Sequence, residues 1–193
     1  MRVFAALPLP PAVVRSLAAA LTPLRLRYSR LRWVPPEGLH VTLHFFGEVS
    51  DDAVAALRGA LDDPALRGPA IRTRLGIPGQ FPSSGNPRVL WVGFEKGVDE
   101  MSAFWGLFES KIAPLARYGG PRAEWLPDKR GFAPHITLAR NNGGALDHGW
   151  REGLGVPPED FLLQECVLFQ SILGREGARY IPLRRIPFER GNR

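Results

Sequence analysis

The feature that most constrains the fold is an order of secondary structure that occurs twice along the chain. Hydrophobic periodicity predicts strand, helix, strand, helix, strand in each half, and the second half adds one more strand. Two copies are too few for a repeat array, which needs at least three units. We therefore expect a single bilobal domain over residues 1–193, with sequence halves of approximately 1–87 and 88–193.

The predicted elements define an α+β fold. Ser50 is a natural N-cap, Pro114 is expected to end or kink its helix, and prolines in the last strand indicate a sheet edge. We expect two pseudo-two-fold-related, mainly antiparallel sheets that face a central cleft, with helices outside. Predicted strands cover 2–7, 39–46, 71–77, 88–94, 135–139, 161–173 and 179–188; predicted helices cover 11–27, 51–61, 99–118 and 145–154; and 78–87 is a predicted loop.

Composition narrows the class of protein. The chain is 45% hydrophobic and 23% charged, which is ordinary for a folded protein and excludes a disordered one. Cys166 is the only cysteine, so an internal disulfide and a cysteine-based zinc site are excluded, and a reducing compartment fits. No apolar run approaches the roughly 18 residues that span a membrane. We expect a cytoplasmic monomer without membrane contacts.

The charge favours anionic ligands. The formal net charge is +6 and the pI about 10.2, which attracts nucleic acids and phosphates. Most basic residues are arginine, the better bidentate phosphate ligand. A GC-rich coding sequence raises arginine as well, together with alanine, glycine and proline, so the arginine excess alone does not indicate phosphate binding, whereas the positive net charge favours anionic ligands in either case.

Two His-x-Thr motifs carry the chemical signal. They are His40-Val41-Thr42-Leu43 and His135-Ile136-Thr137-Leu138, and they contain half of the four histidines and half of the four threonines. Residues i and i+2 share one face of a strand, so each histidine points the same way as its threonine. If the lobes are related by an approximate two-fold axis, the two polar pairs converge across the cleft.

Such a constellation suits metal-free phosphodiester hydrolysis. One neutral imidazole can accept a proton from water while the other, protonated, donates to the leaving alcohol. Threonine hydroxyls can donate to the non-bridging phosphate oxygens. The symmetry of the motifs leaves open which histidine is the acid. The alternative is that the four residues are ordinary strand residues, which a matched pair of motifs makes improbable.

At these motifs the sequence resembles the two-histidine phosphoesterase superfamily, and within it the RNA 2′,3′-cyclic phosphodiesterases, also called 2′-5′ RNA ligases. Similar segments are 2–7, 33–34, 39–43, 46–47, 134–140 and 177–183. The resemblance implies opening of a terminal 2′,3′-cyclic phosphate to a 2′-phosphate, with no cofactor, and possible reverse 2′-5′ ligation. It also implies His40 as proton donor and His135 as proton acceptor.

Four further residues are candidates for substrate binding. Arg140 is the best candidate for a phosphate or ribose contact, although strand alternation turns it away from the cleft unless the strand ends after Ala139. His44 shares the predicted face of His40 and is expected at the cleft mouth. Phe45 is a candidate base-stacking platform, and Arg130 lies in a basic loop that could steer RNA.

Two other readings remain open from sequence. The same site could act on another cyclic phosphate or on a 2′-5′ oligonucleotide, because the motifs recognise only phosphate. The chain could also be a non-catalytic RNA- or nucleotide-binding module, but binding alone does not require paired proton-transfer groups. Two histidines without nearby carboxylates or cysteines make a poor zinc site, so no metal is expected.

Overall fold

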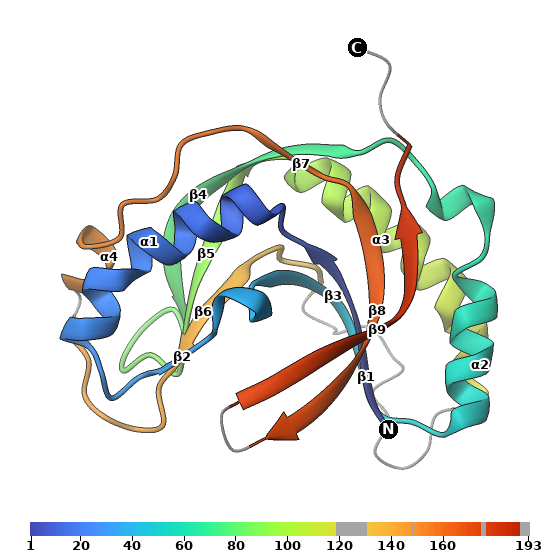
Figure 1. Ribbon diagram of the computed structural model, residues 1–193, viewed down its shortest axis with the longest axis horizontal. Helices are drawn as coiled ribbons and strands as arrows, with labels where there is room; N and C mark the ends of the chain where they lie inside the picture. Colours follow the sequence, from blue (N-terminus) through green and yellow to red (C-terminus); the bar gives the residue numbers. More distant parts are fainter. Residues whose placement is uncertain (119–130, 148, 175–176, 190–193) are drawn as a thin grey trace.

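The computed structural model describes residues 1–118, 131–147, 149–174 and 177–189. It has the predicted α+β class, with a nine-stranded antiparallel sheet and helices packed on it (Figure 1). The strands are β1 (Arg2–Pro8), β2 (Arg32–Trp33), β3 (His40–Glu48), β4 (Ile71–Phe81), β5 (Val89–Lys96), β6 (Ile136–Arg140), β7 (Phe161–Leu163), β8 (Glu165–Gly174) and β9 (Gly177–Pro187). The α-helices are α1 (Pro11–Arg27), α2 (Asp51–Ala60), α3 (Val98–Ile112) and α4 (Gly149–Glu152).

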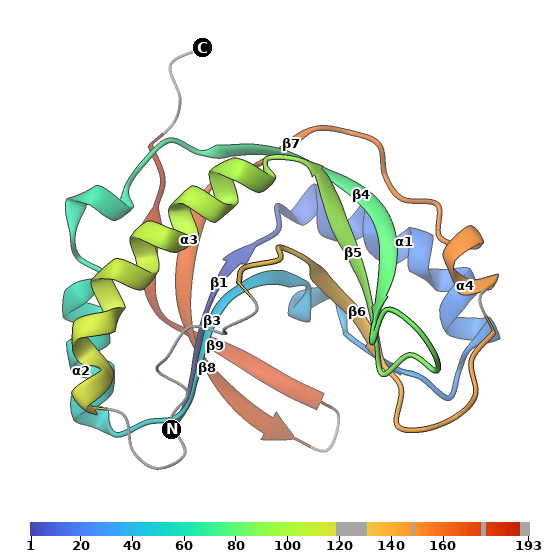
Figure 2. The same ribbon diagram turned by 180° about the vertical axis from the view of Figure 1, so that it is seen from behind.

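The sheet consists of two lobes that meet along one short contact. The β1 lobe has the strand order β3-β1-β8-β9, and the β5 lobe has the order β7-β4-β5-β6, with β2 also paired to β6. The lobes meet where β3 and β6 run antiparallel, with Val41 opposite Ile136. Each lobe takes strands from both halves of the chain, because β8 pairs with β1 and β4 pairs with β5 (Figures 1 and 2).

The helices cover the lobes from outside. In both ribbon views α1 and α4 lie beside the β5 lobe, whereas α2 and α3 lie beside the β1 lobe (Figures 1 and 2). Tyr28, which follows α1, donates a hydrogen bond to Asp147 before α4 at 2.7 Å. Most of the buried apolar residues of both lobes form one hydrophobic cluster. In the described segments no helix is long and apolar enough to cross a membrane.

Local sequence signals explain several helix ends. The Ser50 hydroxyl accepts a hydrogen bond from the Ala53 backbone N–H at 3.2 Å, which confirms the predicted N-cap of α2. Asp51 and Asp52 occupy the first turn, where negative charge is favourable. Helix α3 ends at Ile112, and a 3-10 helix over Ala113–Tyr118 contains Pro114, so the proline ends the α-helix as expected.

Other boundaries differ from the prediction. Strand β4 continues through Pro78 to Phe81, so the predicted loop at 78–87 begins later. Strand β7 pairs only with the first three residues of β4, Ile71–Thr73. The rest of β4 is therefore a sheet edge, where a proline without an N–H breaks no ladder hydrogen bond. The predicted strand over 161–173 is split into β7 and β8, and β9 is an edge strand as predicted.

Candidate active site

The two His-x-Thr motifs meet where the lobes join. Val41 faces Ile136 across β3 and β6, and both side chains are fully buried. One residue to either side, this antiparallel register sets His40 opposite Thr137 and Thr42 opposite His135. Because alternate residues of a strand point to opposite faces, the two motifs present their four polar side chains on one face. The arrangement has the local two-fold symmetry that the sequence predicts.

A backbone hydrogen bond orients each imidazole. His40 Nδ1 lies 2.8 Å from the Gly38 carbonyl oxygen, and His135 Nδ1 lies 2.8 Å from the Ala133 carbonyl oxygen. A carbonyl only accepts, so Nδ1 carries the proton in both rings and a neutral ring has its lone pair on Nε2. The Thr42 hydroxyl lies 3.1 Å from His40 Nε2 and donates to it when that ring is neutral.

Aromatic side chains pack against both imidazoles. The His40 ring centroid lies 5.0 Å from that of Phe4 and 5.5 Å from that of Tyr180, which meets it edge-on. The His135 centroid lies 5.2 Å from that of Phe81 and 6.1 Å from that of Trp91. Each imidazole therefore packs against two aromatic rings of its own lobe.

The Trp91 ring depends on a glycine in the neighbouring strand. Gly79 lies opposite Trp91 in the β4–β5 pair. A Cβ atom at Gly79 would lie 2.2 Å from the Trp91 indole, closer than any real contact. Glycine is therefore what lets the indole lie against β4 beside His135.

The protein disfavours charge on both imidazoles in the absence of ligand. The pKa of His40 is lowered to about 4, mainly by burial and to a smaller extent by the nearby His135, whereas the Gly38 hydrogen bond acts in the opposite direction. Burial also lowers the pKa of His135, and the Arg140 guanidinium adds to this effect. Both rings are thus neutral at pH 7. A bound phosphate anion acts in the opposite direction, because it favours the protonated rings.

A β-bulge brings Arg140 to the same face as the histidines. In the β5–β6 pair Trp91 faces Thr137 and Leu90 faces Ala139, so Leu138 is an extra residue. Ala139 and Leu90 are fully buried, and the exposed Arg140 returns to the other face. The expectation from strict alternation that Arg140 points away from the cleft is therefore wrong. The strand does not end at Ala139; the bulge shifts its alternation instead.

The same irregularity in β3 removes His44 from the site. Ala6 faces Thr42 and Ala5 faces His44, so Leu43 is the extra residue. His44 is only 6% exposed, and its Nδ1 lies 2.6 Å from Glu109 Oε1 of α3. The prediction that His44 lines the cleft mouth is wrong, because the bulge turns its side chain toward the helix.

Phe45 occupies the position in β3 that Arg140 occupies in β6. Each is the fifth residue after its motif histidine, and both follow the bulge. Phe45 faces Phe4, which itself contacts His40, and the Arg2 guanidinium lies 4.7 Å from the Phe45 ring centroid. Phe45 therefore lies on the histidine face and remains a candidate for stacking with a base. The fourth candidate, Arg130, lies outside the described residues.

Sequence reasoning gave no site role to four aromatic residues. Phe4, Tyr180, Phe81 and Trp91 come from four strands, and only their packing reveals that they surround the histidines. Burial raises the pKa of the Tyr180 hydroxyl, while Arg140 and Arg2 lie near enough to oppose that effect. Tyr180 thus contacts the His40 ring and also lies near Arg140 and Arg2. Tyr180 and Phe4 both lie in segments that are similar to the family, which was the only signal available from sequence.

Among the described side chains, no three His, Cys, Asp or Glu residues lie close enough together to hold a metal ion.

Comparison with known proteins places this site in a family. Residues 7–91 match the family model for LigT-like phosphoesterases. An RNA 2′,3′-cyclic phosphodiesterase of Aeropyrum pernix is 32% identical over 154 residues, covering 78% of this chain and 82% of that protein. A solved structure from Thermus thermophilus superposes with a TM-score of 0.76 and 29% identity, covering 100% of both chains. The LigT protein of Escherichia coli in complex with 3′-AMP superposes with a TM-score of 0.69 and 27% identity, covering 97% of this chain and 96% of that one. The chain belongs to the LigT-like phosphoesterase family.

Proposed function

We propose that this protein is an RNA 2′,3′-cyclic phosphodiesterase that hydrolyses a terminal cyclic phosphate to a 2′-phosphate without a metal ion. The observation that carries the proposal is the antiparallel meeting of the two motifs, with each Nδ1 held by a carbonyl and each Nε2 left to exchange protons. The name of the Aeropyrum pernix relative supports the substrate class. Both motifs lie on one chain, which supports a monomer as the active unit. A single, buried free cysteine supports a reducing, cytoplasmic location.

In the proposed reaction His135 Nε2 accepts a proton from the attacking water as its oxygen bonds to phosphorus. The bond from phosphorus to the 3′-oxygen breaks, and protonated His40 donates its Nε2 proton to that oxygen. The Thr42 and Thr137 hydroxyls donate to the non-bridging oxygens. Thr42 becomes available for this because a protonated Nε2 no longer accepts its hydrogen bond.

The lowered pKa values are compatible with these roles. Burial lowers the pKa of His40 to about 4, so a protonated His40 is a strong proton donor, and burial also lowers the pKa of His135, so that ring is neutral as the proton acceptor. The productive state has His40 charged and His135 neutral, and the anionic substrate raises its population. Reverse 2′-5′ ligation would use the same groups with their roles exchanged.

Product analysis on an RNA with a 2′,3′-cyclic phosphate end tests the proposal. In excess chelator we expect an undiminished rate and a 2′-phosphate as the product, identified against synthetic 2′- and 3′-phosphate standards. A 3′-phosphate product would mean that the 2′-oxygen leaves. Loss of activity on chelation, restored by a divalent metal, would contradict the metal-free mechanism.

The pH dependence follows from the lowered pKa values. Because one ring must be charged and the other neutral, kcat/KM should follow a bell-shaped profile. Both pKa values lie below the usual 6.5, so the maximum of kcat/KM should lie on the acidic side of pH 6.5. The kcat profile should be shifted to higher pH, since the bound phosphate favours protonated imidazoles. A kcat/KM maximum above pH 7 would contradict the described electrostatics.

A further inference from the structure

The backbone holds the two motif histidines in different ways. His40 is the first residue of β3, lies opposite Pro8 of β1, and follows a 3-10 helix over Pro36–Gly38. His135 lies one residue before β6, and residues 131–135 form no regular secondary structure. The direction of the His135 ring therefore depends on how this irregular segment is fixed.

A proline stiffens the segment before His135. The ring of Pro134 fixes its own φ angle and restricts the preceding residue, Ala133, to extended conformations. The Ala133 carbonyl oxygen lies 2.8 Å from His135 Nδ1, so it determines which ring nitrogen carries the proton. A contact that fixes Phe132, the residue before Ala133, therefore also limits where this carbonyl can point.

Phe132 stacks on a helix that lies beside the other lobe. Its ring is nearly parallel to the Trp105 indole of α3, with an interplanar angle of 5° and ring centroids 5.4 Å apart. Offset stacking is a favourable arrangement of two aromatic rings. Helix α3 lies beside the β1 lobe, whereas Phe132 leads into β6 of the β5 lobe (Figure 2). The stack thus connects a helix of one lobe to the motif segment of the other.

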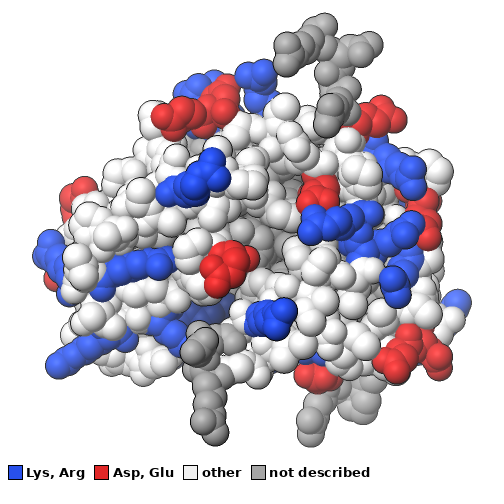
Figure 3. Space-filling model, viewed as in Figure 1, with Lys and Arg blue, Asp and Glu red and all other residues white. Residues whose placement is uncertain are grey.

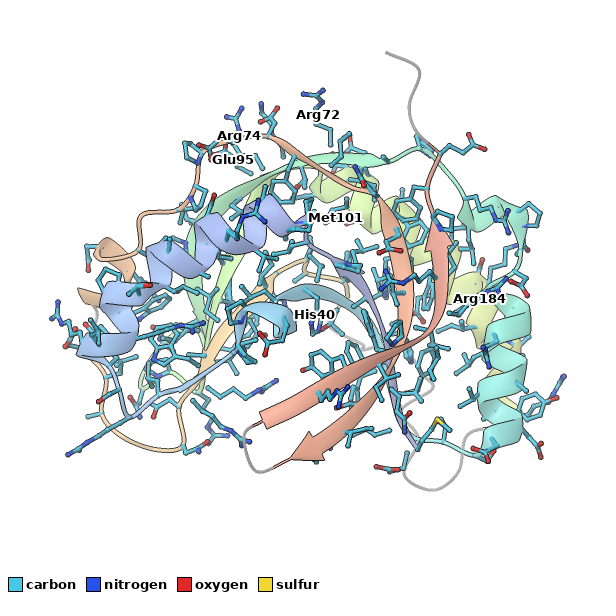
Figure 4. The ribbon with its side chains drawn as sticks, in the orientation of Figure 1. His40, Arg72, Arg74, Glu95, Met101 and Arg184 are labelled. Carbon is cyan, nitrogen blue, oxygen red and sulfur yellow. The ribbon has the colours of Figure 1, made fainter. Side chains whose placement is uncertain are left out.

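The same helix also contacts the strand of the first motif. Glu109, about one turn after Trp105, lies 2.6 Å from His44 Nδ1 of β3, and both side chains are buried. On the face shown in Figure 3 charged side chains are spread over the surface, and the other ion pairs among the described residues are at least partly exposed. Met101, about one turn before Trp105, is fully buried, and Figure 4 shows it near the centre of the molecule, as is His40. Helix α3 therefore contacts both motif-bearing segments.

We propose that Trp105 and Phe132 are positioning residues, whose stack holds the Ala133 carbonyl and thereby the orientation and the Nδ1–H form of His135. The inference rests on the proposed function, in which His135 Nε2 accepts a proton from water, and deepens it. A neutral ring that loses the Ala133 carbonyl can carry its proton on Nε2 instead. That form has no lone pair on Nε2 and cannot act as the base.

Three substitutions of Trp105 test this role in steady-state kinetics. Trp105→Ala should lower kcat about tenfold or more with little change in KM, because misplacement of a reacting group acts mainly on the transition state. Trp105→Phe keeps a ring for the stack and should retain most of the wild-type kcat. Trp105→Leu keeps apolar volume without a flat ring, so it should lower kcat as alanine does.

Phe104 provides a matched control on the same helix. It precedes Trp105 and contacts Phe188 edge-on, with ring centroids 4.9 Å apart. Phe104→Ala removes an aromatic contact that does not involve the segment before His135. It should lower the melting temperature and leave kcat unchanged.

The ring nitrogens of His135 provide a readout that needs no turnover. In nitrogen NMR spectra at neutral pH, the wild-type ring should carry its proton on Nδ1, whereas Trp105→Ala and Trp105→Leu should show both neutral forms. His40 is an internal control, because the Gly38 carbonyl holds its Nδ1. Its signals should be the same in all variants.

The outcomes separate the positioning role from the proposed reaction. An unchanged His135 ring or an unchanged kcat in Trp105→Leu would overturn the positioning role, and so would an equal loss of kcat in Phe104→Ala. If the wild type does not hydrolyse a cyclic phosphate but its His135 ring still responds to Trp105→Leu, only the proposed reaction is contradicted. Should Trp105→Ala fail to fold, Trp105→Leu carries the test, because it keeps the apolar contacts.

Discussion

Replacing His40 or His135 with alanine should lower kcat by at least about 10²-fold, and by up to about 10⁴-fold, while KM changes little. Each variant loses one proton transfer at the transition state and keeps the threonine hydroxyls that we propose donate to the phosphate oxygens. The two imidazoles act in the same step, so the double variant should lose little more than either single variant. Steady-state hydrolysis of an RNA with a cyclic phosphate end measures all three.

Two control measurements distinguish a loss of catalysis from a loss of folding or of binding. Both rings are partly exposed, so circular dichroism and melting should show that the variants remain folded. Binding of a 2′-phosphate product should persist in both. Near-normal turnover in both single variants would contradict acid–base catalysis by these rings.

A sulfur leaving group should separate the roles of the two histidines. In a substrate with sulfur in place of the bridging 3′-oxygen, a thiolate leaves; thiols have a pKa of about 8.5, so the leaving group needs no proton. The defect of His40→Ala, about 10²-fold or more with oxygen, should shrink to a few-fold with sulfur. The defect of His135→Ala should persist, because water must still be deprotonated.

The comparison uses single-turnover rates for both substrates with wild type and both variants. The wild-type enzyme serves as the reference for the intrinsic reactivity of the sulfur substrate. If sulfur instead rescues His135→Ala, then His135 is the proton donor and the two roles must be exchanged. Rescue of neither variant would mean that donation to the leaving group is not the lost function.

The sequence predicted the centre of the site better than its edges. His40, Thr42, His135 and Thr137 follow simple alternation, and one pair of buried residues between them sets their common face. Arg140 and His44 each lie after a β-bulge in their strand. A bulge depends on how a strand is paired with its neighbour, which local periodicity does not record. That is why alternation failed at the same place in both lobes.

The remaining differences also depend on how the strands pair and pack with one another. Pro78 stands inside a strand because only the first residues of β4 have a partner on that side, and the open edge tolerates a missing N–H. Phe4, Phe81, Trp91 and Tyr180 reach the imidazoles from strands that are distant in sequence. No pattern within a single strand could assign them to the site.

Strands β4 and β8 each pair with a strand from the other half of the sequence, and this affects how the two lobes can move relative to each other. A two-part enzyme commonly closes on its ligand by bending at a linker. Here the chain passes repeatedly between the two parts, and the strands that carry the imidazoles are neighbours in one hydrogen-bonded sheet. Spreading the rings apart would require breaking the pairing of Val41 with Ile136, rather than only rotation about a linker. We therefore expect the distance between the two imidazoles to stay nearly constant when a substrate binds. Accommodation of RNA substrates of different lengths must then come from side chains and peripheral loops.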